Sequence, residues 1–153
     1  MAYQLLKPYT DTQYADFVVE HNHNNGLIIE ETETALYALE ANEILVDGEP
    51  QIDPDYEAKQ AEKEAERVAK LTCTKRVFAL MLQELGISYA QLKELIATNE
   101  QAQLEWDLCV ELERNNPLLD IMASQLGITS AQLDGLFKYA NGEITIEDFK
   151  TLV

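Results

Sequence analysis

The chain has 153 residues, of which 46% are hydrophobic and 25% charged, and its 28 acidic and 11 basic residues give a net charge of −17. A chain of this length can bury roughly two thirds of its unfolded surface, so its core needs no metal or disulfide. Acidic residues outnumber basic ones in residues 1–52, in residues 53–70 and in residues 71–153. Such a field repels phosphate backbones and anionic membrane surfaces, which argues against binding to nucleic acid or lipid.

The start of the chain and its cysteines indicate a cellular location. The first ten residues, MAYQLLKPYT, lack the basic stretch and the long apolar run of a signal peptide. The longest apolar run, VFALML at residues 77–82, is too short to span a membrane. Cys73 and Cys109 form no CxxC motif and fall in segments with helical patterns, so we expect reduced, buried and inert thiols. These features predict a cytoplasmic protein.

The first predicted elements are a helix and a strand. Thr10 and Gln13 can form a capping box, and apolar residues follow at helical spacing until Gly26, which predicts a helix over residues 11–24. The next apolar run, LIIE at residues 27–30, is typical of a short strand.

A helical pattern and a turn signal follow. The segment ETETALYALEANE, residues 31–43, places Leu36 and Leu39 on one side of a second short helix. An Asp-Gly pair at residues 47–48 stands between two apolar runs and predicts a small hairpin. Together these elements predict a small α+β unit over residues 1–53.

A charged helix is predicted over residues 54–71. Asp53 can cap it, Pro54 suits its first position, and its content of Ala, Glu and Lys favours a helix. A partner helix could pack on its few apolar positions, but its charges indicate a solvated face. We therefore expect a half-exposed connector between two regions.

The remaining residues, 72–153, have the pattern of a helical domain with five or six helices. The segment TKRVFALMLQEL, residues 74–85, is apolar nearly all round, as a central buried helix would be. A longer helix is predicted over residues 99–114. Its apolar stripe contains Leu104, Trp106, Leu108, Cys109, Val110 and Leu112. The predicted fold class is therefore α+β, with a predominantly α-helical C-terminal bundle, a small N-terminal α+β unit and a connecting charged helix.

Nearly the same phrase occurs twice, as LGISYAQLKEL at residues 85–95 and as LGITSAQLDGL at residues 126–136. In each copy Gly suits a left-handed helix cap, and Ser or Thr forms a capping box with the Gln three residues later. The phrase also resembles the turn of helix-turn-helix DNA-binding domains. A groove reader needs cations, however, and the helices that follow offer Lys93 beside Glu94, and Asp134. Corner packing or protein contact is the favoured interpretation, with a helix-turn-helix regulator as the alternative.

No motif indicates catalysis or cofactor binding. His21 and His23 have no third His or Cys nearby, so a polar helix end is favoured over a metal site. The segment ANGEITIEDF resembles half of a calcium-binding loop, but Phe137 and Tyr139 stand where carboxylates are required. The chain also has no P-loop and no GxGxxG. We therefore predict a protein that is not an enzyme and has no catalytic residues, cofactor or metal.

The candidate residues for binding a partner are aromatic. Tyr3, Tyr9 and Tyr14 crowd the N-terminus, and Trp106 stands among acids in LEWDL. Aromatic side chains that face solvent are frequent hot spots of protein interfaces. A homodimer formed through the connector helix or the N-terminal aromatics is a further hypothesis.

Two long segments, TALYALEANEILVDGEPQIDPDYEAKQAEKEAER and NPLLDIMASQLGIT, resemble small acidic proteins that prophages encode in or near the tail and tail-fibre region. The resemblance covers residues 27–137, and its motifs are turns and helix signals. It implies a minor virion component or an assembly helper, and the lack of fibre-shaft repeats favours a helper or adaptor. The leading hypothesis is a non-enzymatic protein-interaction module that is a tail-associated structural or assembly protein. Its expected partner is a phage tail or fibre protein, and it would act in the cytoplasm or enter the phage particle.

Overall fold

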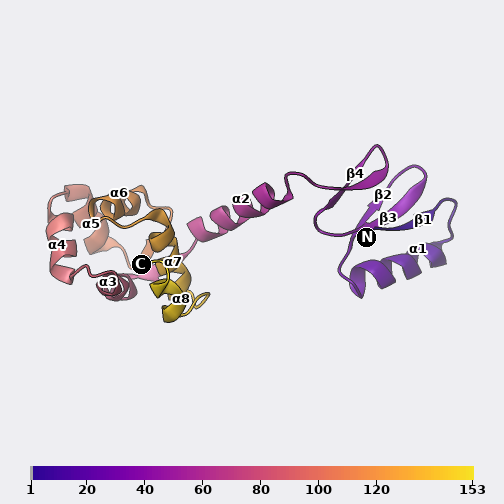
Figure 1. The fold of residues 1–153 in the computed structure, drawn as a ribbon. Coiled ribbons are helices and arrows are strands. Elements are labelled where there is room, and N and C mark those ends of the chain that lie inside the picture. The colour runs from indigo at the N-terminus through magenta and orange to yellow at the C-terminus, as the bar shows by residue number, and fades with distance from the viewer. Residues whose placement is uncertain (1) are drawn as a thin grey trace. The chain divides into compact units, whose positions relative to one another are not determined.

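The computed structural model describes residues 2–153 and has an α+β fold (Figure 1). The chain divides into two compact units, and the boundary between Gln60 and Ala61 falls within helix α2 (Tyr56–Ala69). The N-terminal unit contains small antiparallel sheets, whereas the C-terminal unit is mostly helical. The predicted fold class is confirmed.

The N-terminal unit is built on a three-stranded antiparallel sheet with the strand order β1-β3-β2. Its first elements are β1 (Tyr3–Leu6), α1 (Asp11–Val18), the π-helical turn η1 (Val19–His23), β2 (Ile28–Glu31) and β3 (Ala35–Leu39). The capping box of Thr10 and Gln13 is formed, and α1 with η1 confirms the predicted first helix. Strand β2 confirms the predicted strand. No pattern in residues 3–6 predicts strand β1.

The helix predicted over residues 31–43 is wrong, because this segment contains the central strand β3. Strand β3 pairs with β1 along one edge and with β2 along the other, and all five of its side chains are buried. Tyr37 and Leu39 share a core with Leu45 of the following hairpin. A short apolar run suits a central strand as well as a helix, and here the pairing partners decide.

The predicted hairpin is confirmed, with strands β4 (Glu43–Val46) and β5 (Glu49–Ile52). Both residues of its turn have positive φ, 52° for Asp47 and 82° for Gly48. This backbone is that of a two-residue turn whose twist matches the twist of the flanking strands.

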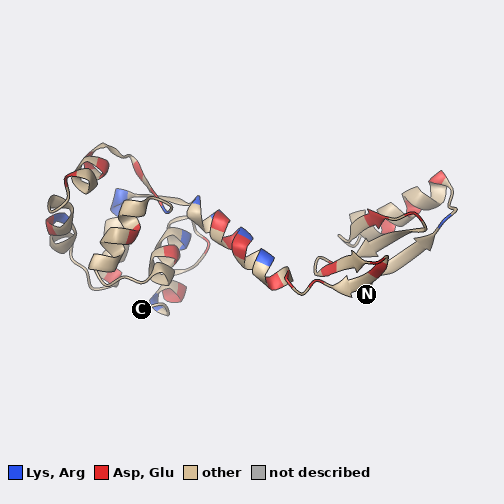
Figure 2. Cartoon of the chain, turned by 90° about the horizontal axis from the view of Figure 1, so that it is seen from above, with Lys and Arg blue, Asp and Glu red and all other residues tan. Residues whose placement is uncertain are grey.

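Helix α2 begins after Asp53 and carries alternating acidic and basic residues (Figure 2). Its last two turns are tied to the C-terminal unit by two ion pairs. Arg67 contacts Glu143 at 2.6 Å, and Glu64 contacts Lys138 at 2.8 Å. The predicted charged helix is therefore formed, and part of its charged surface is used in packing.

The C-terminal unit contains six helices within the described residues, in agreement with the five or six predicted. These are α3 (Lys75–Glu84), α4 (Tyr89–Ala97), α5 (Glu100–Leu108), α6 (Pro117–Gln125), α7 (Ser130–Ala140) and α8 (Ile146–Lys150), and a two-stranded sheet joins β6 (Thr72–Thr74) to β7 (Glu111–Glu113). The fully buried Phe137 and Phe149 lie in the core, and the Phe78 ring lies 6.5 Å from that of Phe137. Gly135 allows the Phe149 ring to approach α7 closely.

The helix predicted over residues 99–114 ends early, at Leu108. Cys109 adopts an extended backbone, with ψ of 145°, and residues 111–113 form β7 instead of further helix. The prediction that both cysteines lie in helices is therefore wrong, because Cys73 belongs to β6 and Cys109 follows α5. Pairing of Cys73 with Leu112 across the sheet fixes this arrangement, and these partners lie far apart in the sequence.

The repeated phrase forms the same corner twice, between α3 and α4 and between α6 and α7. Gly86 and Gly127 have φ of 78° and 73°, in the left-handed region that favours glycine. The N–H groups of Ile87 and Ile128 each donate to the carbonyl five residues earlier, at 2.9 and 2.8 Å. Both isoleucines are buried, so the phrase serves packing in both places.

Candidate functional site

The candidate site is a groove around Trp106, the single tryptophan of the chain. Its main part has a volume of about 480 Å³ and is lined by Lys75, Arg76, Ala79, Leu80, Gln83, Tyr89 and Trp106. It continues past Tyr89 and Trp106 into a hollow of about 240 Å³ that is also lined by Lys93, Ile96, Ala97, Gln103 and Asp107. We call these two parts together the basic groove. Helices α3, α4 and α5 supply all of its residues.

Three cations surround the aromatic rings of the basic groove. The Lys75 Nζ donates to the Trp106 carbonyl at 2.6 Å and lies 5.8 Å from the centre of the Trp106 ring. The Lys93 Nζ lies 5.9 Å from the centre of the Tyr89 ring. Arg76 is exposed and makes no ion pair among residues 2–153. The groove therefore offers apolar and aromatic surface together with positive charge.

This concentration of cations departs from the charge of the unit. Residues 71–153 carry twelve acidic residues and only six basic ones, and three of the six line the basic groove. The other three, Arg114, Lys138 and Lys150, contact carboxylates. The basic groove therefore gathers the three cations of residues 71–153 that make no ion pair with a described carboxylate, and a partner with negative charge would be favoured there.

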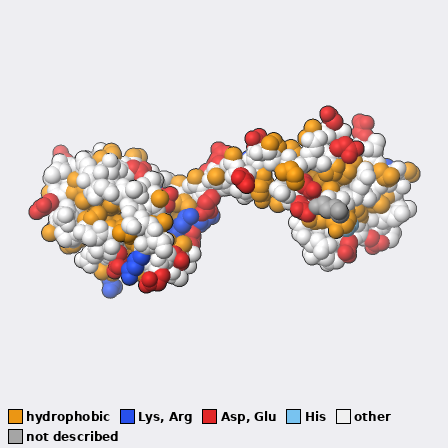
Figure 3. All heavy atoms as spheres, viewed as in Figure 1, with side chains coloured by type: hydrophobic (Ala, Val, Ile, Leu, Met, Phe, Trp, Pro, Cys, Tyr) orange, Lys and Arg blue, Asp and Glu red, His pale blue; other side chains and the backbone are white. Residues whose placement is uncertain are grey.

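The outer side of α5 exposes large apolar side chains. Leu104 is 58% exposed, Leu108 is 73% exposed and Val110, just after the helix, is 85% exposed. We call these three residues the α5 ridge. Apolar side chains lie open to solvent on the visible face of the C-terminal unit (Figure 3). Exposed apolar surface of this kind marks an interaction site when polar residues surround it.

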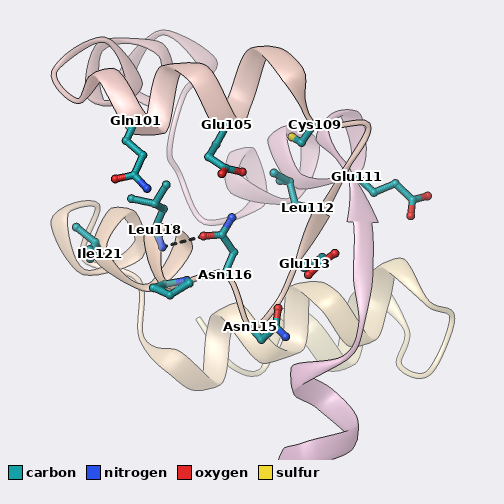
Figure 4. Close-up of a pocket in the computed structure, with 11 residues that line it drawn as sticks. Gln101, Glu105, Cys109, Glu111, Leu112, Glu113, Asn115, Asn116, Leu118 and Ile121 are labelled. Carbon is teal, nitrogen blue, oxygen red and sulfur yellow. Dashed lines mark hydrogen bonds between the residues drawn. The ribbon is translucent and has the colours of Figure 1, made fainter.

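A second hollow lies on the other flank of α5, between α5, α6 and β7 (Figure 4). It has a volume of about 680 Å³ and is lined by Gln101, Glu105, Cys109, Glu111, Leu112, Glu113, Asn115, Asn116, Pro117, Leu118 and Ile121. We call it the acidic cleft. Glu105 projects from α5 into the cleft, whereas Glu111 points outward at its edge (Figure 4). The two flanks of α5 thus carry opposite charge.

Arg114 is the one buried cation among the described residues, and its contacts are structural. Its Nε donates to Asp134 at 2.6 Å, one terminal nitrogen donates to Asp120 at 2.8 Å, and the other donates to Ser130 at 3.1 Å. These partners lie on α6 and α7. The guanidinium therefore links the end of β7 to both helices, and each of its three nitrogens donates a hydrogen bond within the unit.

The candidate residues Tyr3, Tyr9 and Tyr14 lie together with other aromatics in the N-terminal unit. The Tyr3 ring stacks on His21 with 4.4 Å between centroids, and the Tyr9 and Tyr14 rings are 6.0 Å apart. The Tyr9 hydroxyl donates to Glu31 at 2.6 Å, and this hydrogen bond raises the pKa of Tyr9 to about 12. Tyr3 and Tyr14 remain substantially exposed, so their role in binding a partner stays a prediction.

The residues considered for metal or nucleophilic chemistry do not come together. Within residues 2–153 no group of three or more His, Cys, Asp or Glu side chains is placed to hold a metal ion. Both cysteines are free, and burial raises the pKa of the Cys73 thiol to about 12. A thiol with so high a pKa is a poor nucleophile near neutral pH. Among the same residues no helix has the length and apolar character needed to cross a membrane.

The sequence indicated Trp106 but missed the rest of the groove. Lys75 and Arg76 belong to α3 and Lys93 belongs to α4, so these residues share a surface only after the two helices pack together. The sequence places the residues of the α5 ridge in the apolar stripe of one helix, and the structure exposes them. The sequence contains a weak signal of this exposure, because acidic residues interrupt the apolar residues of LEWDLCVELE.

Comparisons of the chain with protein-family models, with curated proteins and with solved structures found no match.

Proposed function

We propose that this protein is a non-enzymatic protein-interaction module that binds through the face of α5, and that it serves as a tail-associated assembly or adaptor protein of a prophage. The observation that carries the first part is the α5 ridge. Leu108 and Val110 are among the most exposed apolar side chains of the described residues. Solubility alone does not account for exposed apolar side chains near a groove that is lined by aromatic rings.

The surroundings of the ridge support protein as the ligand. Trp106 and Tyr89 provide rigid aromatic surface, which is enriched at the hot spots of protein interfaces. Arg76 and Lys93 add positive charge at the rim, where charge governs the rate of association and the choice of partner. A partner segment that combines acidic and apolar side chains would satisfy both features.

The prophage context of the proposal rests on the resemblance of residues 34–67 and 116–129 to small acidic tail-region proteins. An assembly helper must bind a tail or fibre protein, keep it soluble and release it. A strongly negative chain suits this task, because net charge opposes aggregation of the complex.

The test is capture of the tagged full chain from the source cells after prophage induction, followed by mass spectrometry. The proposal predicts enrichment of tail or fibre proteins over cells that carry the tag alone. Capture of transcription proteins and DNA, or capture of nothing above background, would contradict it.

One observation favours the alternative of a helix-turn-helix regulator. Lys75, Arg76 and Lys93 gather beside α4, the helix that follows the LGIS corner. Against this alternative, Glu94 stands on α4 and the whole chain repels phosphates. Fluorescence anisotropy of a labelled DNA duplex at low salt separates the two functions. The regulator requires binding that weakens steeply with salt, whereas the interaction module predicts no change.

A further inference from the structure

We propose that the face of α5 binds the same face of a second copy of this chain, which makes the protein a twofold-symmetric dimer. The inference rests on the proposed interaction function: the second copy covers the face of α5 in the free chain, and a tail or fibre protein takes its place on binding. Three features define this face. The α5 ridge lies in the middle, the basic groove on one flank and the acidic cleft on the other.

The order of these features around α5 follows from helical geometry. Successive residues of a helix are turned by about 100° from one another. Glu105 consequently faces the acidic cleft, and Trp106 faces the basic groove. Leu104 and Leu108, one turn apart, project between the two flanks on the outer side. The face therefore runs from the carboxylates of the acidic cleft through the apolar ridge to the three cations of the basic groove, which also includes the carboxylate of Asp107.

Two copies of a surface with this pattern bring opposite charges together for only one orientation of the twofold axis that relates them. An axis parallel to α5 places the two α5 helices side by side and brings the basic groove of each copy opposite the acidic cleft of the other. A twofold axis that crosses α5 at a right angle would instead oppose groove to groove and cleft to cleft. Charge complementarity therefore selects the parallel arrangement.

The individual side chains fit this arrangement. Arg76 and Lys93 are exposed without an ion pair among the described residues, and the Lys93 Nζ lies over the Tyr89 ring. Across the interface each would lie near Glu105 or Glu111 of the other copy. The α5 ridges of the two copies would meet at the centre and exclude water from one another.

The test uses sedimentation velocity of the full chain over a wide range of concentration. The basic-flank variant carries Arg76→Glu and Lys93→Glu, and the acidic-flank variant carries Glu105→Lys and Glu111→Lys. The wild-type chain is expected to dimerise. Each variant alone brings like charges together, so its dimer should weaken by at least about tenfold.

Mixing the two variants provides the decisive result. In a mixed pair every reversed charge meets a charge of opposite sign, so the mixture should recover the dimer that each variant lost. The recovery also shows that both variants are folded. Variants that dimerise like the wild type, or a mixture that stays monomeric, would overturn the inference.

A strictly monomeric wild-type chain would also overturn the inference, but it would leave the proposed function open. In that case a chain that still captures tail or fibre proteins retains its interaction role with a different partner. A monomer that captures nothing contradicts both proposals.

Discussion

Individual residues stabilise the two helix corners and the centre of the C-terminal unit. Gly86 and Gly127 adopt the left-handed backbone, and a Cβ atom built on either residue would meet no atom within 4 Å. These two positions therefore require glycine because of their left-handed backbone, and not because a side chain would clash with a neighbour. The two glycines and the capping boxes that follow them are local signals, and for this reason the sequence predicted both corners correctly.

Replacement of Gly86 by alanine should lower the free energy of unfolding by about 1 kcal/mol, the cost of a left-handed backbone for an L residue. Gly86→Asn should cost less, because asparagine tolerates this conformation better. Urea denaturation of the two variants beside the wild type measures both effects. Equal stability of wild type and Gly86→Ala would show that the corner can relax without cost.

Arg114 is the second residue whose replacement should be costly. Arg114→Met removes the cation that Asp120 and Asp134 share and leaves both carboxylates near an apolar side chain. Because these acids are partly exposed, we expect a loss of about 2 kcal/mol, less than for a fully buried pair. The matched control is Lys63→Met, an exposed cation of α2 without an ion pair among the described residues, whose replacement should change stability by less than about 0.5 kcal/mol. A similar urea midpoint for the two variants would refute the structural role of Arg114.

At the scale of elements, prediction from sequence succeeded where the signal was local and failed where pairing was distant. The capping boxes at Thr10, Ser88 and Thr129 each predict a helix that the structure contains. Strand β3 and residues 111–113 carry apolar patterns that also suit helices, and they become strands because β1, β2 and β6 pair with them. The basic groove was missed for the same reason, since three helices must pack before it exists.

The attachment of α2 to the C-terminal unit should depend on pH. Hydrogen bonds from Arg67 and Lys138 lower the pKa of Glu64 to about 2, and Arg67 also lowers the pKa of Glu143. The unfolded chain, in which Glu titrates near 4.5, therefore binds more protons in this range than the folded chain does. The stabilisation from these carboxylates is complete above pH 4.5 and is lost as the pH falls towards 2.

Thermal unfolding followed by circular dichroism between pH 2 and pH 6 tests this dependence. The melting temperature should fall as the pH decreases through this range, and Glu64→Gln should make the fall shallower. Glu66→Gln, which changes a neighbouring exposed acid of α2, should leave the slope unchanged. Identical slopes for the two variants would mean that the ion pairs of Glu64 contribute nothing to stability.

At the scale of the whole molecule, the chain has two hydrophobic cores, and its two most exposed large apolar side chains among the described residues, Leu108 and Val110, lie outside both. The core of the N-terminal unit contains Tyr37 and Leu39, and that of the C-terminal unit contains Phe137 and Phe149. Both cores explain why the protein folds, but neither explains the α5 ridge. The proposed function accounts for the α5 ridge by a partner that covers it.

The measurement that tests this claim most directly is quantitative capture of partners by three forms of the tagged chain in the source cells. These forms are the wild type, Leu108→Glu on the α5 ridge, and Leu6→Glu, a control leucine of the N-terminal unit that is 63% exposed. Both variants add the same charge at an exposed leucine. The account predicts that Leu108→Glu loses the proteins that the wild type captures, while Leu6→Glu retains them. Equal capture by the wild type and Leu108→Glu would contradict the claim that the face of α5 binds a partner.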